Sequence, residues 1–331
     1  MTGKLQILTN EKTHSTHNEK QQFKNDVLTG LSKVNKQIPS KYFYDERGSE
    51  LFNQITRHPD YYLTNCELNI INFYKQDLSN LLKNESFNLI ELGPGEGVKT
   101  RLLIDQFLQD NLSFTYYTID VSQKFLNHLI ENFDNELPTL ETVALNSDYL
   151  NGIKWLGLNS KKRNFLLFLG SSIGNYHLHT AKEFLQTIRS FLHPGDYLFI
   201  GFDLLKDVHV MLKAYNDRDG ITREFNLNLL RRINNELGAN FNLDAFYHYG
   251  TYNVYTHAME SYLLSNKAQI VYIEALNKSF GFKKLEPIHV ETSQKYCLSQ
   301  IEKLAYFSQC NLIKNYKDPR HYFVNSLWQV T

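Results

Sequence analysis

LIELGPGEGVKTR, residues 89–101, is the stretch that decides the fold of this 331-residue chain. Its apolar beginning suits a buried strand, and from about Lys99 onward the apolar spacing predicts a helix. Between them, Gly93, Gly95 and Gly97 allow the backbone to bend sharply and to lie close to a ligand. A strand, a tight loop and a helix N-terminus in this order present free backbone N–H groups, which can bind a phosphate or a carboxylate.

The glycines alone leave three interpretations open: a dinucleotide-binding fold, a methyltransferase and a plain tight turn. Their spacing is GxGxG, so it does not match the dinucleotide fingerprint GxGxxG. It does not match the P-loop either, because no Gly-Lys-Ser/Thr follows.

Polar residues at the ends of the next two predicted strands favour one of these ligands. The strand over 114–119 ends at Asp120, where an acidic side chain can bind both hydroxyls of a ribose. The strand over 140–145 leads to Asp148 and Tyr149, which suit the amino group and the ring face of an adenine. Ligands of doubly wound sheets bind at such strand ends, and together these features favour S-adenosylmethionine.

The rest of the chain continues the alternation of strands and helices, which predicts an α/β fold with a parallel sheet. Residues 1–18 show no sustained period and are expected to include a frayed end. Residues 203–295 differ, with helix-rich sequence followed by strand-like pieces around 249–255 and 261–265. The remaining elements that we predict are helices over 67–82, 123–133, 181–192 and 299–308, and strands over 164–169, 196–203, 312–314 and 322–330.

Charge and hydropathy limit the kinds of partner. Lysine plus arginine and aspartate plus glutamate number 35 each, so no strong field for nucleic acid or an anionic membrane is expected. No apolar run has the length of a membrane span, and the N-terminus lacks a signal-peptide core. We therefore expect a cytoplasmic monomer that acts on small molecules.

Cysteine and histidine spacing gives no metal site. Cys66, Cys297 and Cys310 are scattered, which fits a reducing compartment and argues against a disulfide framework. His177 and His179 form an H-x-H pair, but no third ligand with suitable spacing follows. We expect no metal.

Several motifs, in order along the chain, carry a resemblance that covers about residues 25–331. These are KYFYDERGSELFNQITRHPDYYLT (41–64), ELGPGEGVKTRLL (91–103), FLGSSIGN (168–175), DLLKDVHVMLKAYND (203–217) and VETSQKY (290–296). In these motifs the chain resembles the histidine-specific Nα-methyltransferase family of ergothioneine biosynthesis. The resemblance implies a Rossmann-like class I methyltransferase sheet in residues 66–202 plus 296–331, which binds S-adenosylmethionine. It also implies a second, substrate-binding domain in residues 18–65 plus 203–295.

The resemblance also implies which residues bind the cofactor. Gly93 and Gly95 would belong to the binding loop, and Asp120 would hold the ribose. The other implied cofactor residues are Lys99, Asp148 and Tyr149. For Lys99 an ordinary exposed lysine in the first helical turn is the alternative, although helix N-termini disfavour cations.

For the amino-acid substrate, the resemblance implies a second set of residues. Asn175 would accept a hydrogen bond from the α-amine, and Tyr44 would touch the same amine, which makes these two the candidate catalytic residues. Tyr61 and Tyr215 would donate to the α-carboxylate. Glu291 and Ser293 lie two residues apart, so on an extended segment both can meet the imidazole nitrogens.

Each of these assignments has a structural alternative. Tyrosines and phenylalanines together number 43, so a single aromatic residue is more often part of the core than of a site. Asn175 alone could be the cap of a following helix.

The implied activity is transfer of methyl groups from S-adenosylmethionine to the α-amine of L-histidine, giving the trimethylated betaine hercynine. Two departures from the family pattern bear on it: Gly97, a third glycine in the loop, and Ser261, which stands where the histidine enzymes carry methionine beside the substrate side chain. The alternatives are a methyltransferase acting on another amine, such as tryptophan or histamine, and a non-enzymatic S-adenosylmethionine sensor.

Overall fold

A computed structural model describes residues 3–8 and 15–331, with the side chains of residues 15–19 left out. The chain divides into two compact units, and each is built from separate segments. Unit 1 comprises Met1–Asn10, Asn65–Leu205 and Tyr296–Thr331, and unit 2 comprises Glu11–Thr64 and Lys206–Lys295. That one unit binds the cofactor and the other the substrate stays a prediction.

Unit 1 contains an eight-stranded sheet with the order β1-β5-β4-β3-β6-β7-β14-β13. The first six strands are parallel, whereas β14 is antiparallel to β7 and β13 is antiparallel to β14. The predicted α/β class with a parallel sheet is confirmed, and the antiparallel pair β13–β14 forms one edge of that sheet. The strands are β1 (Lys4–Ile7), β3 (Phe87–Leu92), β4 (Phe114–Asp120), β5 (Thr142–Asn146), β6 (Arg163–Phe168), β7 (Tyr197–Asp203), β13 (Cys310–Lys317) and β14 (Phe323–Val330).

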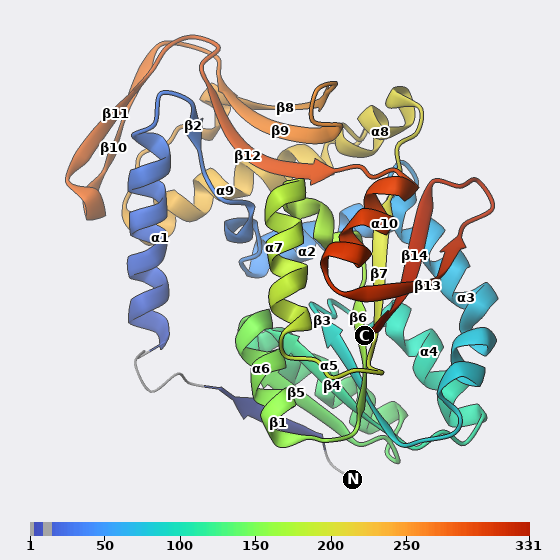
Figure 1. The fold of residues 1–331 in the computed structure, drawn as a ribbon. Coiled ribbons are helices and arrows are strands. Elements are labelled where there is room, and N and C mark those ends of the chain that lie inside the picture. The colour runs from blue at the N-terminus through green and yellow to red at the C-terminus, as the bar shows by residue number, and fades with distance from the viewer. Residues whose placement is uncertain (1–2, 9–14) are drawn as a thin grey trace. The chain divides into compact units, whose positions relative to one another are not determined.

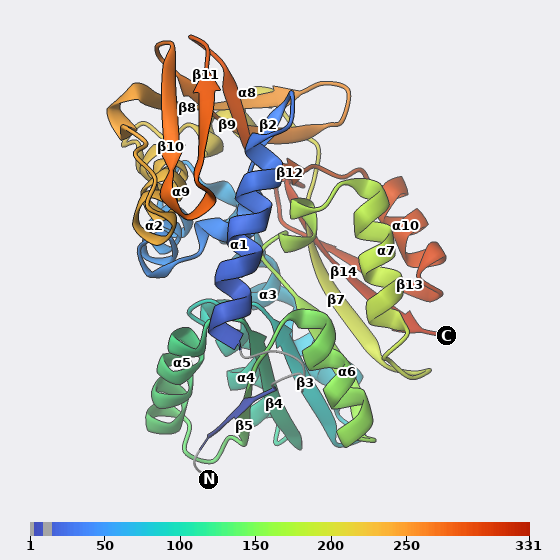
Figure 2. The ribbon, with the colours of Figure 1, turned by 90° about the vertical axis from the view of Figure 1, so that its left-hand side faces the viewer.

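Helices cover both faces of this sheet, as parallel strands require. Figure 1 shows α3 and α4 on one side and α6 and α7 on the other, and in Figure 2 α7 and α10 lie side by side. The helices of unit 1 are α3 (Tyr62–Leu82, which begins in unit 2), α4 (Val98–Gln109), α5 (Gln123–Glu136), α6 (Tyr149–Asn159), α7 (Leu178–Arg189) and α10 (Leu298–Phe307), with the short 3₁₀ helix η2 (Ser172–Asn175).

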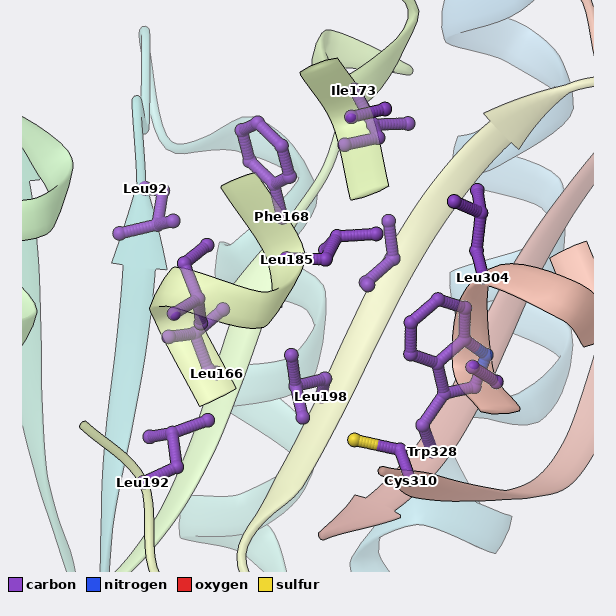
Figure 3. Packing of buried hydrophobic residues seen from close by; sticks show 14 of the residues in the cluster. Leu92, Leu166, Phe168, Ile173, Leu185, Leu192, Leu198, Leu304, Cys310 and Trp328 are labelled. Carbon is purple, nitrogen blue, oxygen red and sulfur yellow. The ribbon is translucent and has the colours of Figure 1, made fainter. Parts of the chain in front are cut away.

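One hydrophobic core of unit 1 lies between the sheet and α6, α7 and α10. Leu166 and Phe168 from β6 meet Leu185 from α7, and Trp328 from β14 lies near Leu304 from α10 (Figure 3). All five side chains are buried. This packing fixes the ends of β3, β4 and β5, which lead to candidate cofactor residues, and the end of β6, which leads to Asn175.

Two elements of unit 1 differ from the sequence-based expectation. Residues 4–7 do not belong to a frayed end: they form β1, which pairs in parallel with β5 at the sheet edge, with Lys4 opposite Val143. Four residues are too few to show a period, so only the pairing partner stabilises this strand. A helix that was not predicted, α6, begins directly after Asp148.

Unit 2 contains a four-stranded sheet with the order β2-β12-β9-β8 and a separate β10–β11 pair. Figures 1 and 2 show the β10–β11 hairpin, in orange, as a continuation of β9 and β12. The strands are β2 (Lys36–Gln37), β8 (Phe246–Asn253), β9 (Ala258–Ser265), β10 (Gln269–Ile273), β11 (Lys278–Phe282) and β12 (Pro287–Gln294). The helices are α1 (Ser15–Leu31), α2 (Glu46–Arg57), α8 (Val208–Tyr215) and α9 (Ile221–Leu237), with the 3₁₀ helices η1 (Ser40–Phe43), η3 (Leu243–Ala245) and η4 (Glu274–Leu276).

The core of unit 2 forms around α9. Phe225 and Ile233 of this helix are buried in one cluster with Ile55 of α2, Leu263 of β9 and Val290 of β12. This cluster holds β9 and β12 in place, and these two strands carry Ser261, Glu291 and Ser293. Over residues 3–8 and 15–331, none of the helices combines the length and the hydropathy that crossing a membrane needs.

Candidate active site

The glycine loop of unit 1 follows β3 and leads into α4. Gly93, Gly95 and Gly97 all have positive φ, at 66°, 55° and 71°, so the loop uses backbone conformations that other residues adopt only with strain. A side chain placed on Gly95 would meet nothing within 4 Å, whereas one on Gly97 would meet Leu129 Cδ1 at 2.8 Å. The loop is therefore open at Gly95 and packed against α5 at Gly97.

Lys99 does not lie free on the surface of α4. Its Nζ lies 2.7 Å from Glu67 Oε2 on α3, and the Glu67 side chain is fully buried. Glu67 also accepts hydrogen bonds from the backbone N–H of Gly170 and from Asn325 Nδ2, each at 2.8 Å. This ion pair ties α4 to the loop after β6, and sequence reasoning missed Glu67 because no motif marks it.

Glu91, the acidic residue near the end of β3, has a structural role, because hydrogen bonds within unit 1 occupy its carboxylate. Thr100 Oγ1 and Tyr116 OH donate to its two carboxylate oxygens, each at 2.5 Å. Burial raises the pKa of Glu91, and these two hydrogen bonds oppose that effect. Glu91 thus anchors the first turn of α4 to β4, beneath the glycine loop.

Asp120 ends β4, as predicted, and lies beside the same loop. The backbone N–H of Gly93 donates to Ile119 O at 3.0 Å, which brings the start of the loop to the end of β4. Asp120 Oδ1 accepts from the backbone N–H of Ser122 at 2.8 Å. Burial raises the pKa of Asp120, so a hydrogen-bonding ligand would find a carboxylate that is already largely removed from water.

Asp148 and Tyr149 follow β5, with a second function that the sequence did not indicate. Asp148 is the N-cap of α6, since its Oδ1 accepts from the backbone N–H of Asn151 at 3.0 Å. Tyr149 begins α6, and its hydroxyl lies 2.5 Å from the position that a Gly93 Cβ would occupy. Only glycine at residue 93 leaves room for this tyrosine, so the two predicted cofactor residues lie together.

Asn175 ends the short helix η2 after β6, and its side chain is exposed. Among the described residues, no hydrogen bond joins this side chain to another group. The cap of α7 is His177, which makes no side-chain capping bond, so the alternative that Asn175 caps the following helix is wrong. The amide is available to a ligand.

In unit 2, Tyr215, Ser293 and a residue that was not predicted, Lys295, form one hydrogen-bonded cluster. Tyr215 OH donates to Ser293 Oγ at 2.7 Å. Lys295 Nζ donates to Tyr215 OH at 2.9 Å and to Ser293 Oγ at 2.8 Å, and lies 4.7 Å from the Tyr215 ring centroid. The lysine has no exposed surface.

Glu291 lies two residues before Ser293 on β12 and opposite Ser261 on β9. Ser261 Oγ donates to Glu291 Oε2 at 2.9 Å, so this serine contacts the carboxylate directly. Burial raises the pKa of Glu291, while the Ser261 hydroxyl and the Lys295 charge act to lower it. Glu291 and Ser293, which their spacing predicts on one face of a strand, therefore each have a hydrogen-bonding partner: Ser261 for Glu291, and Tyr215 and Lys295 for Ser293.

Tyr44 and Tyr61 belong to an aromatic group in unit 2. The Tyr44 ring centroid lies 5.4 Å from that of Phe52 and 5.7 Å from that of Phe225, and Phe52 lies 6.5 Å from Tyr61. Tyr44 keeps 41% of its surface exposed. The pKa of Tyr44 is raised mainly by loss of water around its hydroxyl and, to a smaller extent, by the negative charge of Glu291. The phenol therefore stays neutral.

The predicted residues thus fall into two groups, and each group is described within its own unit. Unit 1 holds the cofactor candidates and Asn175. Unit 2 holds the other substrate candidates, which are Tyr44, Tyr61, Tyr215, Ser261, Glu291 and Ser293. In residues 3–8 and 15–331, no group of three or more His, Cys, Asp or Glu side chains is arranged to hold a metal ion. The assignments of the predicted site residues to particular ligands stay predictions.

Comparison with known proteins tests the family assignment. Residues 23–330 match the family described as histidine-specific methyltransferase, SAM-dependent. Over 274 residues the chain is 36% identical to the histidine N-alpha-methyltransferase of Mycolicibacterium smegmatis, covering 82% of this chain and 83% of that protein. The protein of the same name from Mycobacterium tuberculosis is 34% identical over 271 residues, with the same two coverages. Ergothioneine biosynthesis protein 1 of Neurospora crassa is 35% identical over 208 residues, which are 61% of this chain and 23% of that protein.

These matches confirm the resemblance seen in the motifs, the enzyme class and the S-adenosylmethionine cofactor. They agree with the parallel sheet, the glycine loop after β3 and the acidic residue at the end of β4. The chain belongs to the histidine-specific, S-adenosylmethionine-dependent methyltransferase family.

Proposed function

We propose that this protein methylates the α-amine of L-histidine three times, giving the betaine hercynine. The observation that carries the proposal is the pair Glu291 and Ser293 on one face of β12, with Ser261 and Lys295 hydrogen-bonded to them. A carboxylate accepts and a hydroxyl donates, so together they suit the N–H and the bare nitrogen of an imidazole.

The residues of unit 1 fit S-adenosylmethionine in their chemistry. The open backbone at Gly95 and the helix N-terminus after it suit a carboxylate, and we assign Lys99 to the same group. We assign Asp120 to the ribose hydroxyls, and Asp148 and Tyr149 to the adenine. When bound, the cofactor supplies an electrophilic methyl group on sulfur.

The chain's own task is to present a neutral amine in line with that methyl group. Positioning of this kind can contribute about 7–11 kcal/mol to lowering the barrier. We assign Asn175 to accept a hydrogen bond from the amine, because its amide is exposed and has no partner among the described residues. Tyr44, whose neutral phenol and ring lie beside the aromatic group, is assigned to the same amine.

The substrate carboxylate is assigned to the hydroxyl of Tyr61, and Tyr215, whose OH donates its proton to Ser293, is assigned to the substrate site through that serine. An ammonium has no lone pair, so the amine loses a proton before each transfer. The product would enter ergothioneine biosynthesis, the process named for the Neurospora relative. Equal numbers of basic and acidic residues support an enzyme that acts without nucleic acid. We also propose that it is a cytoplasmic monomer.

A product analysis tests this proposal. The purified protein is incubated with S-adenosylmethionine and an equimolar mixture of amino acids and histamine, and products are followed by mass spectrometry over time. We expect mono-, di- and trimethylated histidine to appear in sequence, with the trimethylated form accumulating. Methylation confined to another amine would contradict the substrate, and accumulation of monomethylhistidine alone would contradict trimethylation.

A further inference from the structure

The buried lysine at the end of β12 belongs to no predicted site and needs an explanation. Lys295 has no exposed surface, and burying an ammonium is costly unless its protons find partners. Two of its protons go to hydroxyls that the proposed function places in the substrate site, Tyr215 and Ser293. A lysine held in this way sets what those hydroxyls can do.

The hydrogen bonds determine the direction in which Ser293 acts. An ammonium donates and never accepts, so Ser293 Oγ accepts from Lys295. It also accepts from Tyr215, because a phenol is a stronger donor and a weaker acceptor than an aliphatic hydroxyl. Both lone pairs of Ser293 are then used, and the only thing that it can offer to a ligand is its proton.

Charge leads to the same result. The Lys295 ammonium favours the ionised form of Glu291 against the effect of burial, and in this proposal the two side chains carry one positive and one negative charge. A neutral side chain next to them leaves the charges balanced, whereas a cation adds an uncompensated positive charge in a place with little water. An imidazolium would also bring a second N–H to a hydroxyl that can only donate.

Other ionisable groups nearby do not change this balance. Tyr44, directly after η1, lies near both Glu291 and Tyr215, and the loss of water around its hydroxyl raises its pKa and keeps it neutral. On β9, Glu260 alternates to the other face from Ser261 and accepts from Tyr262 OH at 2.6 Å and from Asn253 at 2.9 Å. Among other charged or titratable side chains on the neighbouring elements, Lys213 pairs with Asp60 and Lys36 with Glu286. His289 on β12 is bonded to Thr292, and burial lowers the pKa of His248 on β8 to about 4.

We propose that Lys295 is a positioning residue that makes Ser293 an obligate donor and so restricts the site to the neutral imidazole form of its substrate. This inference rests on the proposed function, since it concerns the protonation state of the histidine side chain. Glu291 would accept from the single N–H of the ring, and Ser293 would donate to the bare nitrogen. Lys295 would do this without touching the substrate.

The test is histidine binding by calorimetry at pH 8.0 and pH 5.5, with S-adenosylhomocysteine present so that no transfer occurs. With an ordinary imidazole pKa of about 6.5, selection of the neutral form makes affinity about tenfold weaker at pH 5.5. A triazolylalanine, whose ring stays neutral over this range, reports any effect of Glu291 or of the protein as a whole. The pH ratio of histidine affinities is therefore divided by the pH ratio measured for the triazolylalanine.

Variants separate the role of the lysine from a general effect on the fold. Lys295→Met removes the charge and both donors, so Ser293 can accept again and the pH ratio should fall below threefold. Lys295→Arg keeps a cation and should restore a larger ratio. The matched control is Lys206→Met, because Lys206 donates to Tyr62 OH at 2.9 Å and lies 4.4 Å from that ring without touching Ser293. It should keep the tenfold ratio.

A measurement on the unaltered protein covers the case in which Lys295→Met does not fold. At pH 6.0, histidine bound as a neutral imidazole should release about three quarters of a proton more than the triazolylalanine, whose α-amine is the same. This difference is read from calorimetric enthalpies in buffers of different ionisation enthalpy. The absence of this difference in proton release, or a tenfold ratio retained in folded Lys295→Met, would overturn the inference. Failure of the unaltered protein to bind or methylate histidine at all would instead overturn the proposed function and the inference with it.

Discussion

Asp120 shows how a single carboxylate is prepared for a ligand. It lies at the end of β4, its Oδ1 is held by the backbone N–H of Ser122, and burial raises its pKa. A carboxylate that has already lost much of its water gives up less when a ribose hydroxyl replaces the rest. This is why the end of a buried strand suits a ribose better than an exposed acidic residue does.

Asp120→Ala should therefore weaken the binding of S-adenosylhomocysteine by at least tenfold. Charge-assisted hydrogen bonds are worth about 1.5–3 kcal/mol, and the variant removes those to the ribose. Asp105→Ala is the control, because Asp105 is exposed on α4 and pairs only with Arg101. Calorimetric titration of both variants decides, and unchanged affinity in folded Asp120→Ala would mean that the loop binds its ligand in another way.

Asn175→Ala should reduce the rate of methyl transfer by about tenfold or more and leave the affinity for S-adenosylhomocysteine nearly intact. Stability should change by less than about 0.5 kcal/mol, because the side chain is exposed and does not cap α7. Single-turnover rates and thermal unfolding are measured together. Normal turnover with a loss of about 1 kcal/mol in stability would show a structural residue instead.

At the scale of elements, the loop between β3 and α4 combines two different uses of glycine. Gly95 leaves open space for a ligand, and Gly97 allows α5 to pack against the start of α4. The Thr100–Glu91 hydrogen bond and the Lys99–Glu67 ion pair hold the first turn of α4 in place. The loop is therefore fixed at both ends and accessible in its middle.

This division predicts different effects for two similar substitutions. Gly95→Ala should lower the free energy of unfolding by about 1 kcal/mol, the cost of a left-handed conformation alone. Gly97→Ala should cost about 2–4 kcal/mol, because its methyl group also meets Leu129 at 2.8 Å. Urea unfolding of the cofactor-free protein measures both, and equal losses would contradict the packing role of Gly97.

Strand β12 is the corresponding element of unit 2. A bulge between His289 and Glu291 shifts its register against β9, so that Glu291 lies opposite Ser261. The strand then presents Glu291, Ser293 and, directly after its end, Lys295 at alternate positions. Side chains on a strand held by hydrogen bonds to β9 and β2 are positioned more firmly than the same side chains on a loop.

At the scale of the whole molecule, sequence reasoning recovered most elements and missed those that depend on partners. The alternation of strands and helices predicted the α/β fold because each element repeats an apolar period. Helix α6 was missed because it contains Gly152 and Gly157, which lower helix propensity. The structure explains both: a Cβ would lie 2.6 Å from Ile119 Cγ2 at the first and 2.8 Å from Phe191 O at the second.

The residues of the candidate site likewise divide into those that sequence patterns could predict and those that they could not. Gly93, Asp120 and Glu291 could be predicted because they stand at strand ends or within motifs. Glu67 and Lys295 could not, because their importance lies in contacts to residues far away in the sequence, such as Asn325 for Glu67 and Tyr215 for Lys295. No local spacing marks a buried charge whose partners come from other elements.

The central claim is that histidine is the substrate, although the family resemblance puts Ser261 at a position where methionine is expected. Indole offers an N–H to Glu291 but no bare nitrogen, so it would leave the Ser293 proton without an acceptor at a cost of about 1–3 kcal/mol, whereas imidazole satisfies both groups. Ser261 donates to Glu291, so the substitution supports the carboxylate that imidazole needs.

The most direct test compares kcat/KM for L-histidine and L-tryptophan under equal conditions, in the unaltered protein and in Glu291→Ala. We predict that histidine exceeds tryptophan by at least tenfold, and that Glu291→Ala shrinks this ratio. Faster turnover of tryptophan than of histidine by the unaltered protein would contradict the claim.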